Sequence, residues 1–260
     1  MTALLQVDAV SRRFGGYLAL NSATCEIAAG QVHALIGPNG AGKTTLFNII
    51  SGFLRPTSGR ITFKGQDYTG YRPDKILAMG IARNFQQVRL VRGLSVVENV
   101  MIGAHARMNR GLLGNMAEFC GSAAAERQAR DNARSMLDFV GVSGKAGLQP
   151  DDLTLVDQRR LEIARALASG PELLLLDEPA AGMNPTELGE LGALIGRIQA
   201  QGVTILLVEH HMQLVMAIAN CITVLSAGNV IADGPPHIIQ RDPAVISAYL
   251  GSGDEPAVRS

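Results

Sequence analysis

Residues 37–45 form a glycine-rich loop pattern, reading G-P-N-G-A-G-K-T-T. It matches the phosphate-binding pattern G-x-x-x-x-G-K-[ST], in which glycines let backbone N–H groups curl around an anion. Lys43 places a positive charge where the β- and γ-phosphates of a nucleotide would lie, and Thr44 offers a hydroxyl oxygen to Mg²⁺. The pattern therefore predicts a site for a nucleoside triphosphate with Mg²⁺.

The segments on either side of the loop support this interpretation. Val32–Ile36 is a short apolar run and predicts a buried strand, while Thr45–Ile50 predicts the start of a helix. The positive end of that helix would point at the phosphates. The alternative, a glycine-rich turn with a chance lysine, does not explain the flanking strand and helix. The predicted nucleotide contacts in the loop are Asn39, Gly40, Ala41, Gly42, Lys43, Thr44 and Thr45.

Composition narrows the possible partners and compartments. Hydrophobic residues make up 47% of the 260 residues, enough for a sizeable core, and the net charge is zero. A neutral chain argues against a nucleic-acid partner. The three cysteines lack metal-like spacing, and the N-terminus lacks a basic region before a long apolar stretch. We therefore expect reduced thiols in the cytoplasm and no secretion signal.

One long segment needs testing as a membrane span. Residues 210–232 contain no Asp, Glu, Lys or Arg, but they do contain several amide, hydroxyl and glycine residues. A helix over Met212–Ala219 followed by a strand over Cys221–Leu225 explains the pattern better than a span of about 20 apolar residues. Any membrane contact is therefore expected through a partner.

Alternating strands and helices predict an α/β fold of the phosphate-loop NTPase type. Antiparallel strands are expected at Val7–Phe14, Ser22–Ile27 and Ile61–Phe63. Later apolar strands at Leu173–Leu176 and Val203–Val208 are separated by helices, which indicates a parallel sheet covered on both faces.

The expected domain organisation is a single nucleotide-binding domain over residues 1–251. Residues 88–160 form a predicted helical insertion, because segments such as Ala123–Phe139 are Ala-rich, charged and amphipathic. Residues 252–260 are expected to form a flexible tail.

Two carboxylates follow the apolar run at residues 173–176. Asp177, at the carboxyl end of the predicted strand, is placed to hold Mg²⁺, and Glu178 is placed to polarise an attacking water. The alternative is a buried strand with a charged end. The two adjacent acids in the same chain as a phosphate loop favour the functional interpretation.

Together with the phosphate loop, these acids make the chain resemble the ATP-binding-cassette (ABC) ATPases, the motor subunits of membrane transporters. The resemblance covers roughly residues 5–250. The resemblance implies ATP and Mg²⁺ as ligands. It also implies that Gln86 contacts Mg²⁺ or water, and that His210, rather than His211, senses the γ-phosphate. Phe14 matches the aromatic residue that stacks on adenine, with Tyr17 as its alternative.

The stretch Leu153–Asp157 departs from the family pattern L-S-G-G-Q, which in that family grips ATP held by a second subunit. Thr154 keeps a hydroxyl and is the expected ATP contact. Leu155 and Val156 replace the glycines, and Asp157 replaces glutamine and adds negative charge near a phosphate. Since the other motifs are intact, we expect a heterodimer with a different ATPase, in preference to a homodimer.

Further segments, above all Ala180–Glu187, resemble the ATPases of branched-chain (hydrophobic) amino acid importers. That resemblance implies integral membrane permease subunits, a second, different ATPase and, indirectly, an extracytoplasmic solute-binding protein. It places the chain peripherally on the cytoplasmic face of the inner membrane. The surface that meets the permease is expected near Gln86–Leu94, where Arg89 and Arg92 are either contacts or a solvated basic loop.

Three rival functions remain. An ATPase for lipid or lipopolysaccharide export shares the fold and the chemistry, but the stretch Ala180–Glu187 argues against it. A soluble cassette ATPase acting on ribosomes or DNA usually has two cassettes or a coiled-coil insertion, and this chain has neither. A small-molecule kinase would not explain the Gln158–Leu167 helix or the pair Glu178 and His210.

Overall fold

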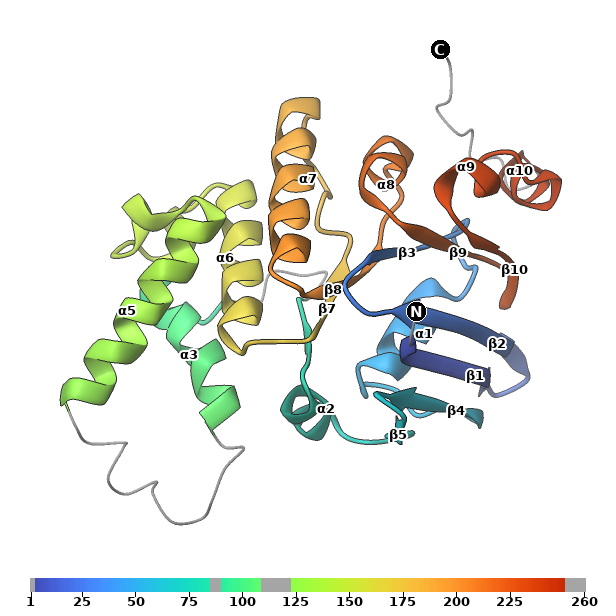
Figure 1. Ribbon diagram of the computed structural model, residues 1–260, viewed down its shortest axis with the longest axis horizontal. Coiled ribbons are helices and arrows are strands. Elements are labelled where there is room, and N and C mark those ends of the chain that lie inside the picture. The colour runs from blue at the N-terminus through green and yellow to red at the C-terminus, as the bar shows by residue number, and fades with distance from the viewer. Residues whose placement is uncertain (1–2, 85–89, 109–122, 251–260) are drawn as a thin grey trace. The chain divides into compact units, whose positions relative to one another are not determined.

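The computed structural model describes residues 3–84, 90–108 and 123–250 (Figure 1). The protein has the predicted α/β fold and divides into two compact units. The first unit comprises Met1–Ile76 and Leu175–Ser260, and the second comprises Leu77–Leu174. The second unit therefore includes the segment 88–160, which the sequence predicts as a helical insertion.

An antiparallel sheet forms the N-terminal part of the first unit. Its order is β2-β1-β4-β5, with β1 at Ala3–Phe14, β2 at Tyr17–Ala28, β4 at Ser58–Phe63 and β5 at Gln66–Asp67. The strands β1 and β2 are longer than the sequence predicts. Register shifts interrupt their pairing, and Ala9 and Ser22 have positive φ angles of 47° and 49°, so the alternation of buried and exposed residues breaks.

Most strands of a second, mostly parallel sheet belong to the first unit. β3 pairs in parallel with β8 on one side and β9 on the other, and β10 pairs antiparallel with β9. The bounds are Val32–Ile36 for β3, Thr204–Val208 for β8, Cys221–Ser226 for β9 and Asn229–Gly234 for β10. Every residue of β3 and β8 is buried, as the continuous apolar runs predict for a sheet covered on both faces. The strand β7, Leu173–Asp177, follows β8 in the sheet order.

Helices cover this parallel sheet. Residues of β3 and β9 form one apolar cluster with Val215, Ile239 and Val245, so the C-terminal helices close one face. The helices with residues in the first unit are α1 at Lys43–Ile50, α2 at Pro73–Met79, α7 at Pro185–Ala200, α8 at Met212–Ile218, α9 at Pro236–Ile239 and α10 at Pro243–Leu250.

Cys25 and Cys221 carry free thiols, as expected. Within the described residues, every helix is too short or too polar to cross a bilayer.

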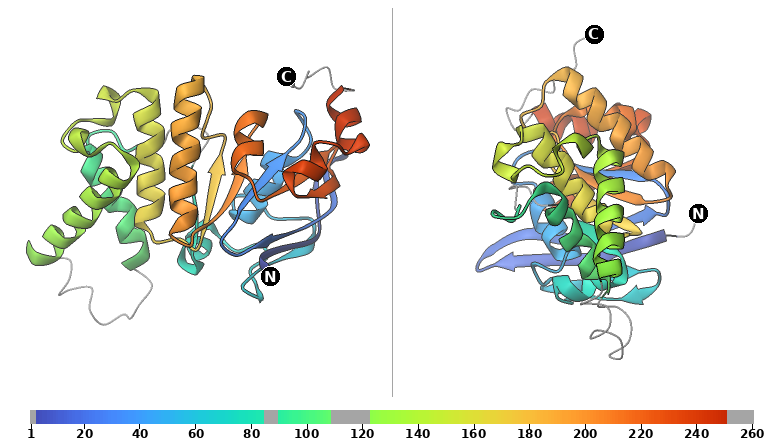
Figure 2. Two further views of the ribbon diagram at one scale, coloured as in Figure 1. Left: turned by 45° about the horizontal axis from the view of Figure 1, so that its top comes forward. Right: turned by 90° about the vertical axis from the view of Figure 1, so that its left-hand side faces the viewer.

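The second unit is mainly helical. α3 (Val96–Met108), α5 (Ala123–Val140) and α6 (Leu155–Ala168) lie side by side (Figures 1 and 2). A Cβ on Gly103 of α3 would lie 1.9 Å from the Arg165 carbonyl oxygen of α6, so glycine permits this close approach. The unit also contains β6 at Ile81–Arg83 and 3-10 helices at Ser143–Lys145 and Pro150–Asp152.

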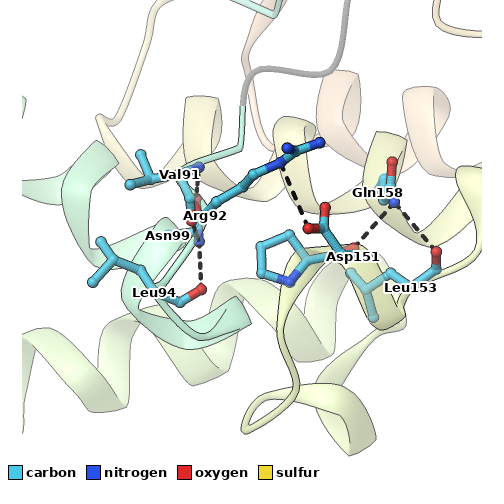
Figure 3. Close-up of polar contacts among 8 residues, drawn as sticks. Val91, Arg92, Leu94, Asn99, Asp151, Leu153 and Gln158 are labelled. Carbon is cyan, nitrogen blue, oxygen red and sulfur yellow. Dashed lines mark hydrogen bonds and ion pairs between the residues drawn. The ribbon is translucent and has the colours of Figure 1, made fainter.

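Asn99 fixes the segment that leads into α3. Its side-chain oxygen accepts the Val91 N–H at 2.8 Å, and its amide nitrogen donates to the carbonyl oxygens of Val91 and Leu94, both at 3.1 Å (Figure 3). Asn99 is fully buried, so these hydrogen bonds satisfy its amide inside the unit.

Candidate functional site

The phosphate loop connects β3 to α1. Gly37 has φ +147°, and a Cβ there would lie 2.0 Å from the Leu225 carbonyl oxygen, so only glycine fits. Gly42, with φ +104°, is the N-cap of α1. The helix therefore begins at Lys43 instead of the predicted Thr45, and the N–H groups of its first turn end at the loop.

Hydrogen bonds hold the shape of this loop. The Gly228 N–H, in the turn between β9 and β10, donates to the Ala41 carbonyl at 3.0 Å, and the Asn21 N–H of β2 donates to the Gly228 carbonyl at 2.8 Å. The Lys43 ammonium donates to the carbonyl oxygens of Gly37 and Pro38 at 2.5 and 3.0 Å. The loop is thus tied to two neighbouring strands, and its lysine lies against the loop's own backbone.

An open cavity of about 260 Å³ lies over the loop. It brings together both candidate aromatic residues, every predicted loop contact and one of the two acids. Its lining consists of Phe14, Tyr17, Ala19, Asn39, Gly40, Ala41, Gly42, Lys43, Thr44, Thr45 and Glu178. An aromatic wall beside backbone N–H groups and a lysine is suited to a ligand with a planar base and phosphates.

Phe14 and Tyr17 face each other across the turn between β1 and β2. Both are exposed, at 46% and 61% of the residue's possible surface. The Arg12 guanidinium lies over the Phe14 ring and also donates to the Arg55 carbonyl at 2.9 Å. The Phe14 ring is therefore the better fixed of the two.

Asp177 and Glu178 lie at the carboxyl end of β7. Asp177 is buried, and Glu178 is half-buried with a positive φ of 47°. The Glu178 N–H donates to the Val208 carbonyl of β8 at 2.9 Å. A non-glycine residue in this backbone region costs about 1–3 kcal/mol and is typical of functional sites. The oxygen donors of Thr44 and Asp177 are of the type that Mg²⁺ prefers, whereas Gln86 lies outside the described residues.

His210 and His211 follow β8 and differ in their surroundings. The His211 Nδ1 atom lies 3.1 Å from the Glu209 carboxylate, whereas His210 is exposed. The two rings pack against each other in a tilted arrangement, with centroids 4.4 Å apart. Because His211 is engaged by Glu209, the arrangement favours His210 as the residue that meets a ligand. The sequence does not predict the contacts that Glu209 makes. Its only local sign is an acidic residue directly after an apolar strand.

The altered Leu153–Asp157 stretch lies in the second unit and opens α6. Thr154 is the N-cap: its hydroxyl accepts the Asp157 N–H at 3.2 Å and donates to the Asp157 carboxylate at 2.6 Å. The helix consequently begins at Leu155, before the predicted Gln158. Gln158 donates to the carbonyls of Pro150 and Leu153 at 3.0 and 3.3 Å, which fixes the preceding loop (Figure 3).

Asp157 does not present an isolated negative charge. Lys145 forms an ion pair with its carboxylate. Partial burial alone would raise the pKa of Asp157, but hydrogen bonds from Lys145 and Thr154, with the charges of Lys145 and Arg160, lower it overall. The expected repulsion toward phosphate is therefore partly neutralised, while the Thr154 hydroxyl is used within its own helix cap.

Arg92, one of the two arginines expected near a permease, is strongly exposed. It forms an ion pair with Asp151 at 3.5 Å, and Arg89 lies outside the described residues (Figure 3). An exposed pair of this kind adds little stability, so Arg92 can exchange partners at low cost.

Comparison with known proteins gives consistent matches. Residues 20–181 match the sequence family described as "ABC transporter", and residues 229–255 match "Branched-chain amino acid ATP-binding cassette transporter". The high-affinity branched-chain amino acid transport ATP-binding protein LivG of Salmonella typhimurium is 43% identical over 249 residues, covering 95% of this chain and 98% of LivG. BraF of Pseudomonas aeruginosa, of the same description, is 42% identical with the same coverage.

Solved structures agree with these matches. A nucleotide-free ATP-binding cassette from an ABC transporter has a TM-score of 0.83 at 28% identity, covering 95% of this chain and 99% of that one. An ATP-binding cassette of an ABC transporter in its ADP conformation has a TM-score of 0.83 at 28% identity, covering 96% and 100%.

Proposed function

Because this chain belongs to the ABC transporter family of ATP-binding cassettes, we propose that it drives an importer for branched-chain or other hydrophobic amino acids. The protein is a transporter ATPase by family membership. The solute class is supported by the likeness to LivG, which extends over 98% of that protein. It is also supported by residues 229–255, which match the family of branched-chain amino acid cassettes.

The residues of the cavity suggest how ATP is held. Phe14, or Tyr17 in its place, would stack on adenine, and the loop from Asn39 to Thr45 would bind the phosphates, with Lys43 opposing their charge. Thr44, Asp177 and Gln86 would hold Mg²⁺, which neutralises charge on the phosphates. Their oxygen donors fit that ion.

Glu178 and His210 would carry the chemistry. The Glu178 carboxylate, in the cavity lining, would polarise the attacking water, and His210 would sense the γ-phosphate. Glu178→Gln should abolish hydrolysis while ATP binding is retained, which a fluorescent-nucleotide titration and a phosphate-release assay can separate.

We place the protein peripherally on the cytoplasmic face of the inner membrane, bound to integral permease subunits that receive solute from an extracytoplasmic binding protein. We further propose that a second, different ATPase completes the motor. The support comes from the altered stretch Leu153–Asp157. Its Thr154 hydroxyl donates to the Asp157 carboxylate, which also pairs with Lys145, so both groups already have partners inside this protein. The second ATPase would supply the signature that completes this protein's own ATP site.

Light scattering on Glu178→Gln with ATP tests the heterodimer. This variant should accumulate any competent ATP sandwich because it binds ATP without turnover. We expect a monomer alone and a dimer once the partner ATPase is added, with Lys43→Ala as the control that binds no ATP. A stable homodimer of Glu178→Gln would overturn the proposal that the motor needs two different ATPases.

Uptake by proteoliposomes tests the solute class. The assembled complex with its binding protein should accumulate labelled leucine in an ATP-dependent manner, and Glu178→Gln in the same complex should not. ATP-dependent lipid release without leucine uptake would instead support the exporter alternative.

A further inference from the structure

Glu209 is a buried acid with no role in the function proposed above. It directly follows β8, and only 1% of its surface is exposed. A buried carboxylate is costly unless its charge is compensated by hydrogen bonds. Its contacts therefore call for a functional explanation as well as a structural one.

The two carboxylate oxygens of Glu209 bind different loops of the first unit. Oε1 accepts the Ala180 N–H at 2.8 Å, in the loop that follows β7 and Glu178. Oε2 accepts the N–H groups of His210 and His211 at 3.1 and 3.3 Å, in the loop that follows β8. One side chain thus links the loop carrying the proposed base to the loop carrying the proposed phosphate sensor.

Glu209 also reaches the His210 ring through its neighbour. Its Oε2 atom lies 3.1 Å from Nδ1 of His211, and the His211 ring packs at a tilt against that of His210 at a centroid distance of 4.4 Å. The carboxylate therefore restrains the backbone of His210 directly and its ring indirectly.

We propose that Glu209 is a positioning residue for ATP hydrolysis, which sets the Glu178 loop and His210 relative to each other. This inference rests on the roles proposed above for Glu178 and His210. A carboxylate suits the task because it only accepts hydrogen bonds and has two oxygens to share between the loops. Glutamine has the same shape, but its NH₂ group would oppose the N–H groups of one loop.

Glu209→Gln is therefore the informative change. We expect kcat to fall by about tenfold or more, because small displacements of catalytic groups are costly, while the Kd for ATP changes by less than about twofold. Glu187→Gln is the matched control. Glu187 also accepts a backbone N–H, from Asn184 at 2.8 Å, but as part of a helix cap. It should leave kcat unchanged.

Histidine side-chain NMR gives a second readout that a purely structural role would not move. With five histidines in the sequence, the ring signals of His210 and His211 can be assigned by single substitutions. Both should shift in folded Glu209→Gln and stay in place in Glu187→Gln.

The outcomes separate this inference from the proposed function. If His210→Ala loses turnover while folded Glu209→Gln keeps it, or if the His210 signals do not move, Glu209 has no positioning role although the proposed function stands. Full turnover in both His210→Ala and Glu178→Gln would overturn the proposed roles and this inference together. Loss of kcat with retained ATP affinity and shifted His210 signals supports it.

Discussion

The guanidinium carbon of Arg12 lies 4.7 Å from the centroid of the Phe14 ring, at the end of the β1–β2 hairpin. Arg12 is itself fixed by its hydrogen bond to the Arg55 carbonyl. One face of the Phe14 ring is thus covered by a positive charge, and a base would stack on the other. Tyr17, across the turn, is more exposed.

Phe14→Ala should therefore weaken ATP binding more than Tyr17→Ala does. Loss of one base–aromatic stack costs about 1–3 kcal/mol, or roughly 5- to 150-fold in Kd. Titration with a fluorescent ATP analogue measures both variants, and Phe14→Tyr should restore most of the affinity. A larger effect for Tyr17→Ala would make Tyr17 the adenine contact.

Two helix glycines should respond in opposite ways to alanine. Gly103→Ala would place a Cβ against the Arg165 carbonyl and force α3 from α6, lowering the free energy of unfolding by about 1–3 kcal/mol. Gly189→Ala, in α7, meets open space and should raise it by about 0.5–1 kcal/mol. Urea denaturation of both variants tests the pair, and equal effects would contradict the close packing of α3 on α6.

Repairing the altered signature should raise ATP turnover. Val156→Gly with Asp157→Gln returns the last two positions of the stretch to the family pattern and frees Lys145 from its ion pair. If the second ATP site then becomes active, turnover of the assembled transporter should rise by about twofold. The control is Asp131→Gln, which removes an exposed aspartate charge from α5. Unchanged turnover would mean that this stretch does not limit the cycle.

His33 should make stability depend on pH. Burial lowers its pKa to about 4, although Asp233, 3.9 Å away, acts to raise it. Between these two pKa values His33 is protonated in the unfolded protein, where the histidine pKa is about 6.5, but neutral in the folded protein. Stability is therefore lost as the pH falls from about 6.5 toward 4, by about 2 kcal/mol at about pH 5.

Urea denaturation of His33→Gln at about pH 7 and about pH 5 isolates this contribution. The variant should lose about 2 kcal/mol less than the natural protein between the two conditions. Cys25 and Cys221 also lie near Asp233, but burial, reinforced by Asp233, raises the pKa of each thiol, so neither titrates in this range. An equal loss in both proteins would show that folding does not lower the pKa of His33.

Local sequence patterns predicted which loop residues come together around the cavity, because these residues lie close together in the sequence. The strand, the loop and the helix after it are continuous, and the glycines have fixed conformational roles. The adjacent acids Asp177 and Glu178 could be placed for the same reason: a buried apolar strand ends directly before them.

Contacts between distant segments could not be predicted in this way. The pairing of Lys145 with Asp157 joins a 3-10 helix to α6, and the bond from Ala180 to Glu209 joins loops after two different strands. No local pattern in the sequence indicates either contact. Helix starts were misplaced for a related reason: the caps at Gly42 and Thr154 act through backbone geometry and hydrogen bonding, which hydrophobic patterns do not report.

The hydrogen bonds through Gly228 limit how chimeric transporters can be built from this protein. The match to the family of branched-chain amino acid cassettes begins at residue 229, which would invite a junction there when C-terminal segments are exchanged between relatives. Gly228 holds the phosphate loop, and the Asn229 side chain accepts a hydrogen bond from Asn21 at 3.0 Å. A junction at 229 would therefore combine turn residues from two parents beneath the nucleotide site. A junction before β9 would keep the whole hairpin from one parent and separate exchange of the C-terminal segment from damage to ATP binding.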